Sequence, residues 1–179
     1  MSRNPGSFIP VTLARRLIPL ATVGLLGAAH GGAHATVDWL QVAPTCVPDS
    51  MQTLQFGLTS EAGGLLHSAG RNPPLAYFCP VWNPDDFAAT PSWKYLKLQY
   101  RDQNPGGGGV TARLYAKHRS TGAVSLVASV GSLFGSAVQV ATVPLPAPLS
   151  FKRFAYYVVL GLDGFDQPVE AHMVMLTTN

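Results

Sequence analysis

The sequence predicts an all-β protein, an antiparallel β-sandwich of the jelly-roll or immunoglobulin-like kind. Two observations lead to this prediction. Several segments alternate apolar and polar residues with a period of two, as half-buried antiparallel strands require. Turns rich in glycine and proline separate these segments, and no segment shows the period of a long amphipathic helix. Short, evenly spaced strands of this kind favour a sandwich.

The first element is expected to be a secretory leader over residues 1–35. Two arginines open an apolar run within residues 15–29, and the small residues Ala33 and Ala35 suit a signal peptidase. The run is shorter than the roughly 20 residues that cross a bilayer, and its proline and glycines disfavour a permanent buried helix. We therefore expect cleavage after Ala35, a single domain over residues 36–179, no membrane span after cleavage, and a secreted or periplasmic location.

Charge argues against one class of partner. The chain has 12 Lys and Arg against 9 Asp and Glu. Three of the basic residues and none of the acidic ones lie in the leader, so residues 36–179 are formally neutral. A neutral domain has no broad field to attract nucleic acid or anionic lipid, and we expect no nucleic-acid partner.

Cys46 and Cys79 are the two cysteines of the chain. An even number of cysteines in an oxidising compartment predicts a disulfide, with two buried free thiols as the alternative. The bridge would close a loop of about 33 residues, for which chain entropy gives about 3–4 kcal/mol of stability. A proline follows soon after each cysteine, which suggests strand ends. The bridge should then tie an N-terminal segment to a neighbouring strand.

Alternation is clearest in residues 94–101 and 110–117. In the second segment, Arg113, Tyr115 and Lys117 lie on the polar face, opposite a row of apolar residues. A turn at residues 120–122 should join this strand to the next one as a hairpin. The expected strands cover residues 53–58, 75–79, 94–101, 110–117, 124–130, 137–143, 154–162 and 169–177.

Two irregular segments, residues 60–74 and 83–92, are the first places to look for a site, because long ordered loops often carry function. Trp82 and Trp93 flank the second loop, and Phe87 lies inside it. Exposed aromatic rings can stack on sugars or anchor a protein partner. The competing interpretation is that these rings belong to the hydrophobic core.

Signatures of catalysis are absent from residues 36–179. There is no nucleophile-elbow serine, no zinc-binding helix motif and no dinucleotide fingerprint. His67, His118 and His172 stand far apart, so they are expected on sheet faces, although a metal site shared by the last two stays open. The acids at residues 85–86 and 163–166 suit turns better than calcium binding or glycoside hydrolysis. We expect no enzyme, no cofactor and no metal.

The cysteine pattern resembles that of a group of secreted bacterial β-rich proteins of uncharacterised activity. Cys46, the segment 79–81 after an aromatic residue, and the segments 100–102 and 114–115 carry the resemblance, which implies no activity. Chaperone–usher pilins are similar in size and also have one early disulfide. This chain departs from them because its closing strand lacks their penultimate tyrosine and because its strands suffice for a complete sandwich.

The leading interpretation is a non-catalytic β-sandwich with a structural or binding role and an unknown partner, such as a glycan or an envelope protein. The alternative is a carbohydrate-binding module that uses Trp82, Phe87 and Trp93. A fibre subunit comes third and a hydrolase fourth. Solvent exposure of the three aromatic rings distinguishes the first two interpretations.

Overall fold

Two antiparallel sheets make up the part of the chain that the computed structural model describes, residues 37–70, 73–83 and 90–179. Two short helices, η1 (Ala43–Thr45) and α1 (Met51–Phe56), lie near its beginning. Sheet A contains β1 (Trp39–Val42), β3 (Leu58–Thr59), β4 (Leu65–His67), β6 (Tyr95–Asp102), β9 (Gly135–Pro144) and β11 (Val169–Thr177). Sheet B contains β2 (Val47–Pro48), β5 (Leu75–Val81), β7 (Gly109–His118), β8 (Val124–Gly131) and β10 (Phe154–Asp163).

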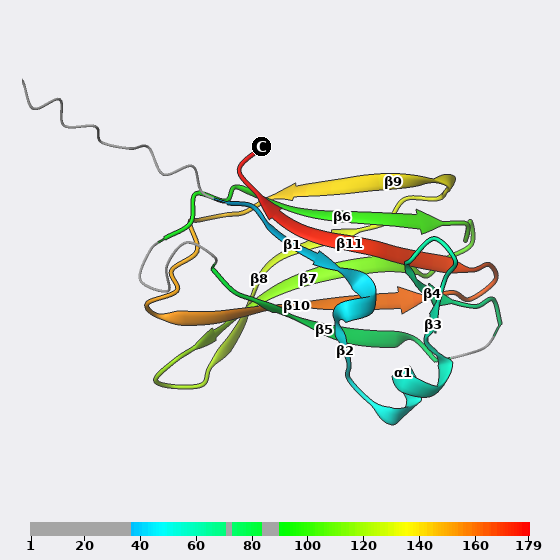
Figure 1. Cartoon of the computed structure of the whole chain (residues 1–179), viewed down its shortest axis with the longest axis horizontal. Coiled ribbons are helices and arrows are strands. Elements are labelled where there is room, and N and C mark those ends of the chain that lie inside the picture. The colour runs from blue at the N-terminus through cyan, green and yellow to red at the C-terminus, as the bar shows by residue number, and fades with distance from the viewer. Residues whose placement is uncertain (1–36, 71–72, 84–89) are drawn as a thin grey trace, which may run out of the picture. The chain divides into compact units, whose positions relative to one another are not determined.

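The two sheets lie in separate layers, with β9, β6 and β11 in one and β10 and β5 in the other (Figure 1). The order is β3-β4-β11-β6-β9 in sheet A, where β1 also pairs with β11, and β2-β5-β10-β7-β8 in sheet B. This architecture confirms the predicted β-sandwich. The predicted leader, residues 1–35, lies outside the described residues.

The hydrophobic core lies between the sheets and is built by the apolar face of each strand. Leu96 and Leu98 of β6 are fully buried, as are Leu114 of β7 and Leu160 of β10. Burying a side chain of this size stabilises the fold by about 1.5–3 kcal/mol. The apolar residues of the period-two pattern thus face the core, as the sequence predicted.

Seven of the eight expected strands are present among the described residues, as β5 to β11. The hairpin turn after β7 is also confirmed: the Gly122 amide donates to the His118 carbonyl at 2.8 Å. Gly122 has a φ of 72°, a left-handed conformation that glycine adopts without steric cost. The closing strand β11 is central in sheet A, with β6 on one side and β4 and β1 on the other.

The prediction of a strand over residues 53–58 is wrong, because most of this segment forms α1. The Ser50 hydroxyl caps the helix by accepting the Thr53 amide at 3.1 Å. The Thr53 hydroxyl in turn donates to the Asp49 carboxylate at 2.6 Å. These side-chain bonds satisfy groups that an unsupported short helix would leave unpaired, so the helix forms despite its apolar alternation.

The predicted disulfide between Cys46 and Cys79 is present, with an S–S distance of 2.05 Å. Cys46 comes just before β2, and β2 pairs with β5, so the bridge does join an N-terminal segment to a neighbouring strand. Cys79, however, lies inside β5 rather than at its end. Pro80 is tolerated there because β2 pairs only with Tyr77 and Phe78, which leaves no strand facing the missing N–H.

Candidate functional site

The structure separates the three aromatic residues that the sequence singled out. Trp93 is only 2% exposed; it packs edge-on against Phe151 and its indole N–H donates to the Val37 carbonyl at 2.9 Å. It is therefore a core residue, and the expectation that it contacts a ligand is corrected. Phe87 lies outside the described residues. Trp82 is 53% exposed and directly follows β5.

A different aromatic group lies on the side of sheet B that faces away from the core. We call this surface the outer B face. Its residues alternate with the core residues of β5, β7 and β10, and the register of these strands sets them side by side. It comprises Ala76, Phe78 and Pro80 of β5, Ala155, Tyr157, Val159 and Gly161 of β10, and Thr111, Arg113, Tyr115 and Lys117 of β7.

Three aromatic rings form a row across the outer B face. Tyr157 and Tyr115 are direct cross-strand partners, and their rings stack with centroids 5.4 Å apart and planes 17° apart. The Phe78 ring lies on the other side of Tyr157, at 5.8 Å and tilted by 51°. Phe78 is 41% exposed, and both tyrosines are half-buried. The three rings of neighbouring strands are thus in contact with one another and partly exposed to solvent.

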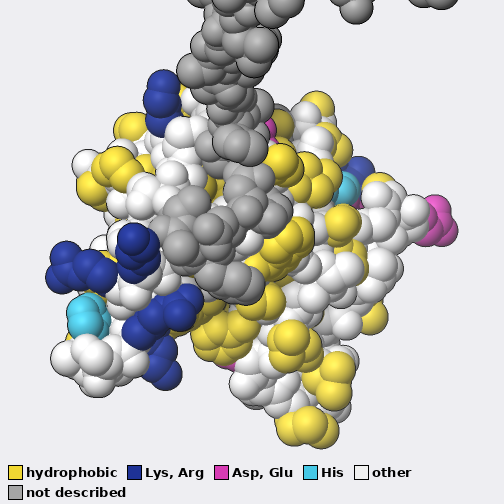
Figure 2. Space-filling view, turned by 60° about the vertical axis from the view of Figure 1, so that its left-hand side comes forward, with side chains coloured by type: hydrophobic (Ala, Val, Ile, Leu, Met, Phe, Trp, Pro, Cys, Tyr) yellow, Lys and Arg dark blue, Asp and Glu magenta, His cyan; other side chains and the backbone are white. Residues whose placement is uncertain are grey.

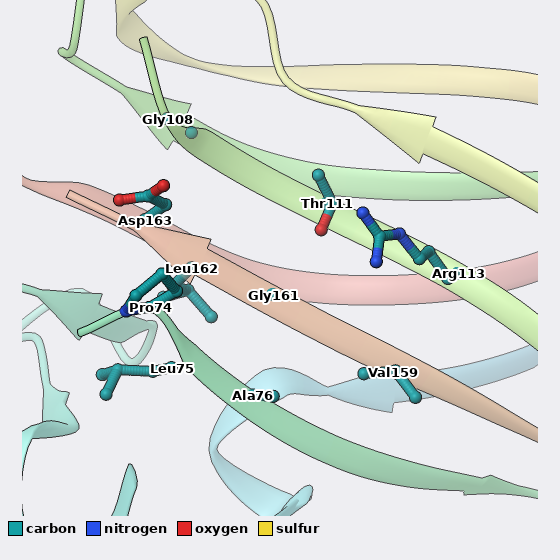
Figure 3. A pocket seen from close by; sticks show the side chains of 11 residues that line it. Pro74, Leu75, Ala76, Gly108, Thr111, Arg113, Val159, Gly161, Leu162 and Asp163 are labelled. Carbon is teal, nitrogen blue, oxygen red and sulfur yellow. The ribbon is translucent and has the colours of Figure 1, made fainter. Parts of the chain in front are cut away.

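A groove of about 360 Å³ adjoins this row toward the end of β10. Val159 and Gly161 of β10 and Thr111 and Arg113 of β7 line it, with Asp163 at its end (Figure 3). In that view the Arg113 side chain extends toward Thr111. A Cβ on Gly161 would lie 2.7 Å from the Thr111 hydroxyl oxygen, so glycine keeps the floor of the groove open.

Cations lie along β7 on the outer B face and continue beyond the end of that strand. Arg113 and Lys117 are exposed on either side of Tyr115. Beyond the strand end, the Arg119 amide donates to the Arg153 carbonyl at 2.9 Å, so these two arginines extend the pairing of β7 with β10. Figure 2 shows most of the visible Lys and Arg side chains gathered in one group beside a histidine.

The outer face of sheet A carries a second polar group, part of which lines a groove of about 470 Å³. Arg101 of β6 donates to the Glu170 carboxylate of β11, and the other Glu170 oxygen lies 3.3 Å from His172 Nε2. The Glu170 side chain is only 4% exposed. The imidazole of His172 also lies under Gly64, where an added Cβ would be 3.0 Å from Nδ1. The Arg101 side chain is 37% exposed, so the arrangement is an ion pair between a buried carboxylate and a partly exposed guanidinium.

The remaining candidates do not assemble into a catalytic or metal centre in the part of the chain described. His118 lies at the end of β7 with its ring against Phe154, whereas His172 is in sheet A, so the two share no site. Both nitrogens of His67 face backbone carbonyls. No group of three or more His, Cys, Asp or Glu among the described residues is arranged to hold a metal ion.

Two further expectations concern the acidic residues and a membrane-spanning segment. The acids at residues 85–86 lie outside the described residues, whereas Asp163 lines the groove. Across the described ranges, no helix combines the length and hydropathy that a membrane span needs.

Sequence reasoning missed Phe78 and Tyr157 as site residues. The signal for Tyr115 was present, because it shares the polar face of its strand with Arg113 and Lys117. What the sequence does not show is that β7 pairs with β10 and β10 with β5, and it is this pairing that brings the three rings together.

No protein-family model matches the chain, and no curated protein is similar to it in sequence. Among solved structures, it is similar to the family 6 carbohydrate-binding module CsCBM6-3 from Clostridium stercorarium in complex with cellobiose, at 9% identity and a TM-score of 0.47. That match covers 79% of this chain and 94% of the other. A xylan-binding module CBM15 gives 8% identity and a TM-score of 0.46, covering 80% and 98%.

A catalytic domain of a GH87 α-1,3-glucanase in complex with nigerose is also similar, at 9% identity and a TM-score of 0.40. That match covers 79% of this chain but only 28% of the glucanase chain. Likenesses at this level carry no information about a ligand, so function has to be inferred from the residues of this chain.

Proposed function

We propose that this protein is a non-catalytic carbohydrate-binding module and that the outer B face is its binding surface. The observation that carries the proposal is the row of Phe78, Tyr157 and Tyr115, with ring centroids 5.8 and 5.4 Å apart across three strands. Sugar rings have flat C–H surfaces that pack on aromatic rings, and each ring in the row offers such a position.

The groove beside the rings supplies the polar half of sugar recognition. Thr111, Arg113 and Asp163 place a hydroxyl, a guanidinium and a carboxylate around apolar walls. A site with apolar surface and a few convergent polar groups is typical of small-ligand binding. Sugars match this combination because hydroxyl groups surround their C–H faces, whereas a purely apolar protein partner would leave the three polar groups without a role.

The groove also favours binding over hydrolysis. Asp163 is the one carboxylate among the described residues that line it. Glycoside hydrolysis normally requires a pair of carboxyl groups, one on each side of the bond that is cleaved. We therefore assign the surface to recognition of a glycan rather than to its cleavage.

The proposal is tested by binding of the purified protein to a panel of neutral and acidic polysaccharides in affinity electrophoresis. The variant Tyr115→Ala/Tyr157→Ala should lose at least about tenfold in affinity, which corresponds to about 1.4 kcal/mol. Phe134→Ala is the matched control, because Phe134 is an exposed aromatic residue in the turn between β8 and β9.

Circular dichroism and thermal unfolding of each variant separate a loss of binding from a loss of folding. The proposal is wrong if no polysaccharide on the panel binds. It is also wrong if the folded double variant binds as well as the Phe134→Ala control.

A further inference from the structure

We infer that the glycan bound by the outer B face is anionic, a polysaccharide bearing carboxylate or sulfate groups, and that a row of cations along β7 and β10 recognises those groups. This inference rests on the proposed function, since it names the class of glycan that the same surface binds. The row consists of Arg113, Lys117, Arg119 and Arg153, which we call the cation row.

The cation row follows the strand direction and contains an aromatic position. Arg113, Tyr115 and Lys117 alternate along one face of β7. At about 3.4 Å per residue, Arg113 and Lys117 are about 14 Å apart along the strand, and Arg119 is about 20 Å from Arg113. A polymer lying along β7 over the Tyr115 ring would therefore meet a cation before the ring and further cations after it.

The cations in this row are available to a ligand. In the described residues, the ion pairs are Arg101 with Glu170 and His172 with Glu170, and both lie in sheet A. Arg113, Lys117, Arg119 and Arg153 are exposed and take part in neither. Among the described residues, no carboxylate forms an ion pair with any of the four.

The far end of the row concentrates positive charge. Arg119 and Arg153 are opposite each other across the extended pairing of β7 with β10. Like charges directly opposite one another on a sheet are unfavourable. Contacts with Phe154 hold both side chains: Arg119 Nε donates to its carbonyl at 3.4 Å, and the Arg153 guanidinium lies 5.5 Å from its ring centroid. A bound anion between them would relieve the repulsion.

The surface suits an acidic sugar polymer better than a nucleic acid. Its groove end presents the Asp163 carboxylate and the Thr111 hydroxyl, which can bond the hydroxyl groups of sugar rings. The domain as a whole also lacks the net positive charge typical of nucleic-acid binders, since residues 36–179 are formally neutral. An alternation of hydroxyl-rich and charged positions along the ligand matches an acidic polysaccharide.

The test compares ligands that differ in charge but share sugar rings. Polygalacturonate and its fully methyl-esterified form are compared with dextran sulfate, unmodified dextran and a single-stranded DNA oligonucleotide. We expect polygalacturonate or dextran sulfate to bind at least about tenfold more tightly than its neutral counterpart. Raising the salt concentration should weaken that binding, because exposed charges are screened. Which of the two acidic polymers binds decides between carboxylate and sulfate.

Variants then assign the effect to the cation row. Arg113→Gln/Lys117→Gln should weaken binding of the acidic polymer about fivefold to tenfold, since each exposed charge contact is worth about two- to fivefold. Arg113→Lys/Lys117→Arg should retain most of the affinity. Lys97→Gln is the matched control, because Lys97 lies on β6 in sheet A.

The inference is overturned if acidic and neutral forms bind equally, if the Gln variants bind the acidic polymer like Lys97→Gln, or if the DNA oligonucleotide binds most tightly. Binding of neutral polysaccharides that depends on Tyr115 and Tyr157 but not on the cations would overturn this inference alone and leave the proposed function intact. The loss of all polysaccharide binding would overturn both.

Discussion

The outer faces of both sheets carry an arginine, but the arginine of sheet A is in an ion pair and that of sheet B is not, among the residues described. On sheet A, Arg101 is paired with the buried Glu170, and His172 completes the group. On sheet B, Arg113 is exposed beside the ring of Tyr115 and pairs with no carboxylate among the described residues. An alternating strand with an arginine on its polar face can therefore serve either structure or recognition, and what decides is whether another segment covers that face.

The segment between β3 and β4 lies against this group on sheet A. Gly64 approaches His172 closely, and residues 59–62 line a groove together with Arg101 and Glu170. The register of β11 against β6 shifts between Ala171 and Met173, which leaves His172 as an extra residue beside Glu170. No described segment lies over the ring row of sheet B in the same way, since Phe78 remains 41% exposed. The contrast predicts different responses to substitution.

The largest difference should appear when an arginine is removed from each face. Arg101→Met leaves the buried Glu170 carboxylate without its arginine partner and should cost up to about 3 kcal/mol of unfolding free energy. Arg113→Gln should change that free energy by less than about 0.5 kcal/mol. Urea denaturation measures both.

A second substitution identifies the cause of the Arg101 effect. Arg101→Met/Glu170→Leu should regain much of the lost stability, because it removes the unpaired charge together with its partner. If Arg101→Met is as mild as Arg113→Gln, the view that the ion pair between Arg101 and Glu170 stabilises the fold fails.

The next largest effect concerns how the N-terminal segment is attached to sheet B. Cys46→Ala/Cys79→Ala opens a loop with a sequence separation of 33 and should cost about 3 kcal/mol. Thermal unfolding of the variant, compared with the parent protein with and without reductant, measures this. The reduced parent should unfold like the variant, and a parent whose stability is indifferent to reductant would contradict the prediction.

A smaller effect concerns the pH dependence of stability and arises from two tyrosines on the core side of sheet B, Tyr77 and Tyr156. Burial raises the pKa of Tyr77 and of Tyr156 above the ordinary value of 10.0, and the Asp49 carboxylate raises that of Tyr77 further. For Tyr156, the Ser150 amide and the Arg153 charge act in the opposite direction but do not outweigh burial.

The folded state therefore holds these phenol protons more tightly than the unfolded state does. The corresponding stability is fully present below pH 10 and is lost as the pH rises through the raised pKa values. Urea denaturation at increasing alkaline pH should show this loss, and Tyr156→Phe should make it shallower. A Tyr156→Phe variant whose stability falls as steeply as that of the parent would show that Tyr156 contributes nothing to the alkaline loss.

The fold was largely predictable from sequence because its signals are local. Period-two alternation located β6 and β7 within one or two residues of their ends, and the turn ending at Gly122 was visible from its composition. The exception, α1, is also instructive. Its apolar alternation suggested a strand, but the Ser50 cap and the bond from Thr53 to Asp49 stabilise a helix over so short a length.

The site was less predictable because it depends on pairing between distant segments. Tyr115 was recognisable as a residue of the polar face, but its partner Tyr157 lies on a strand that begins 36 residues after β7 ends and that pairs with both β7 and β5. For Trp93, the position beside an irregular segment left two interpretations open, ligand contact and core packing. The second is confirmed, because its ring packs in the core against Phe151. Closeness along the chain therefore predicted neither the pairing of Tyr115 with Tyr157 nor the core position of Trp93.

The central claim is that a glycan lies across the rings of sheet B. The most direct measurement is an NMR titration of the ¹⁵N-labelled protein with an oligosaccharide of a polymer that binds it. The account predicts that chemical-shift changes concentrate at the amides of Phe78, Tyr115 and Tyr157 and extend along β7 toward Lys117. Changes concentrated around Arg101, Glu170 and His172 in sheet A would contradict it, because they would place the ligand on the opposite face of the sandwich.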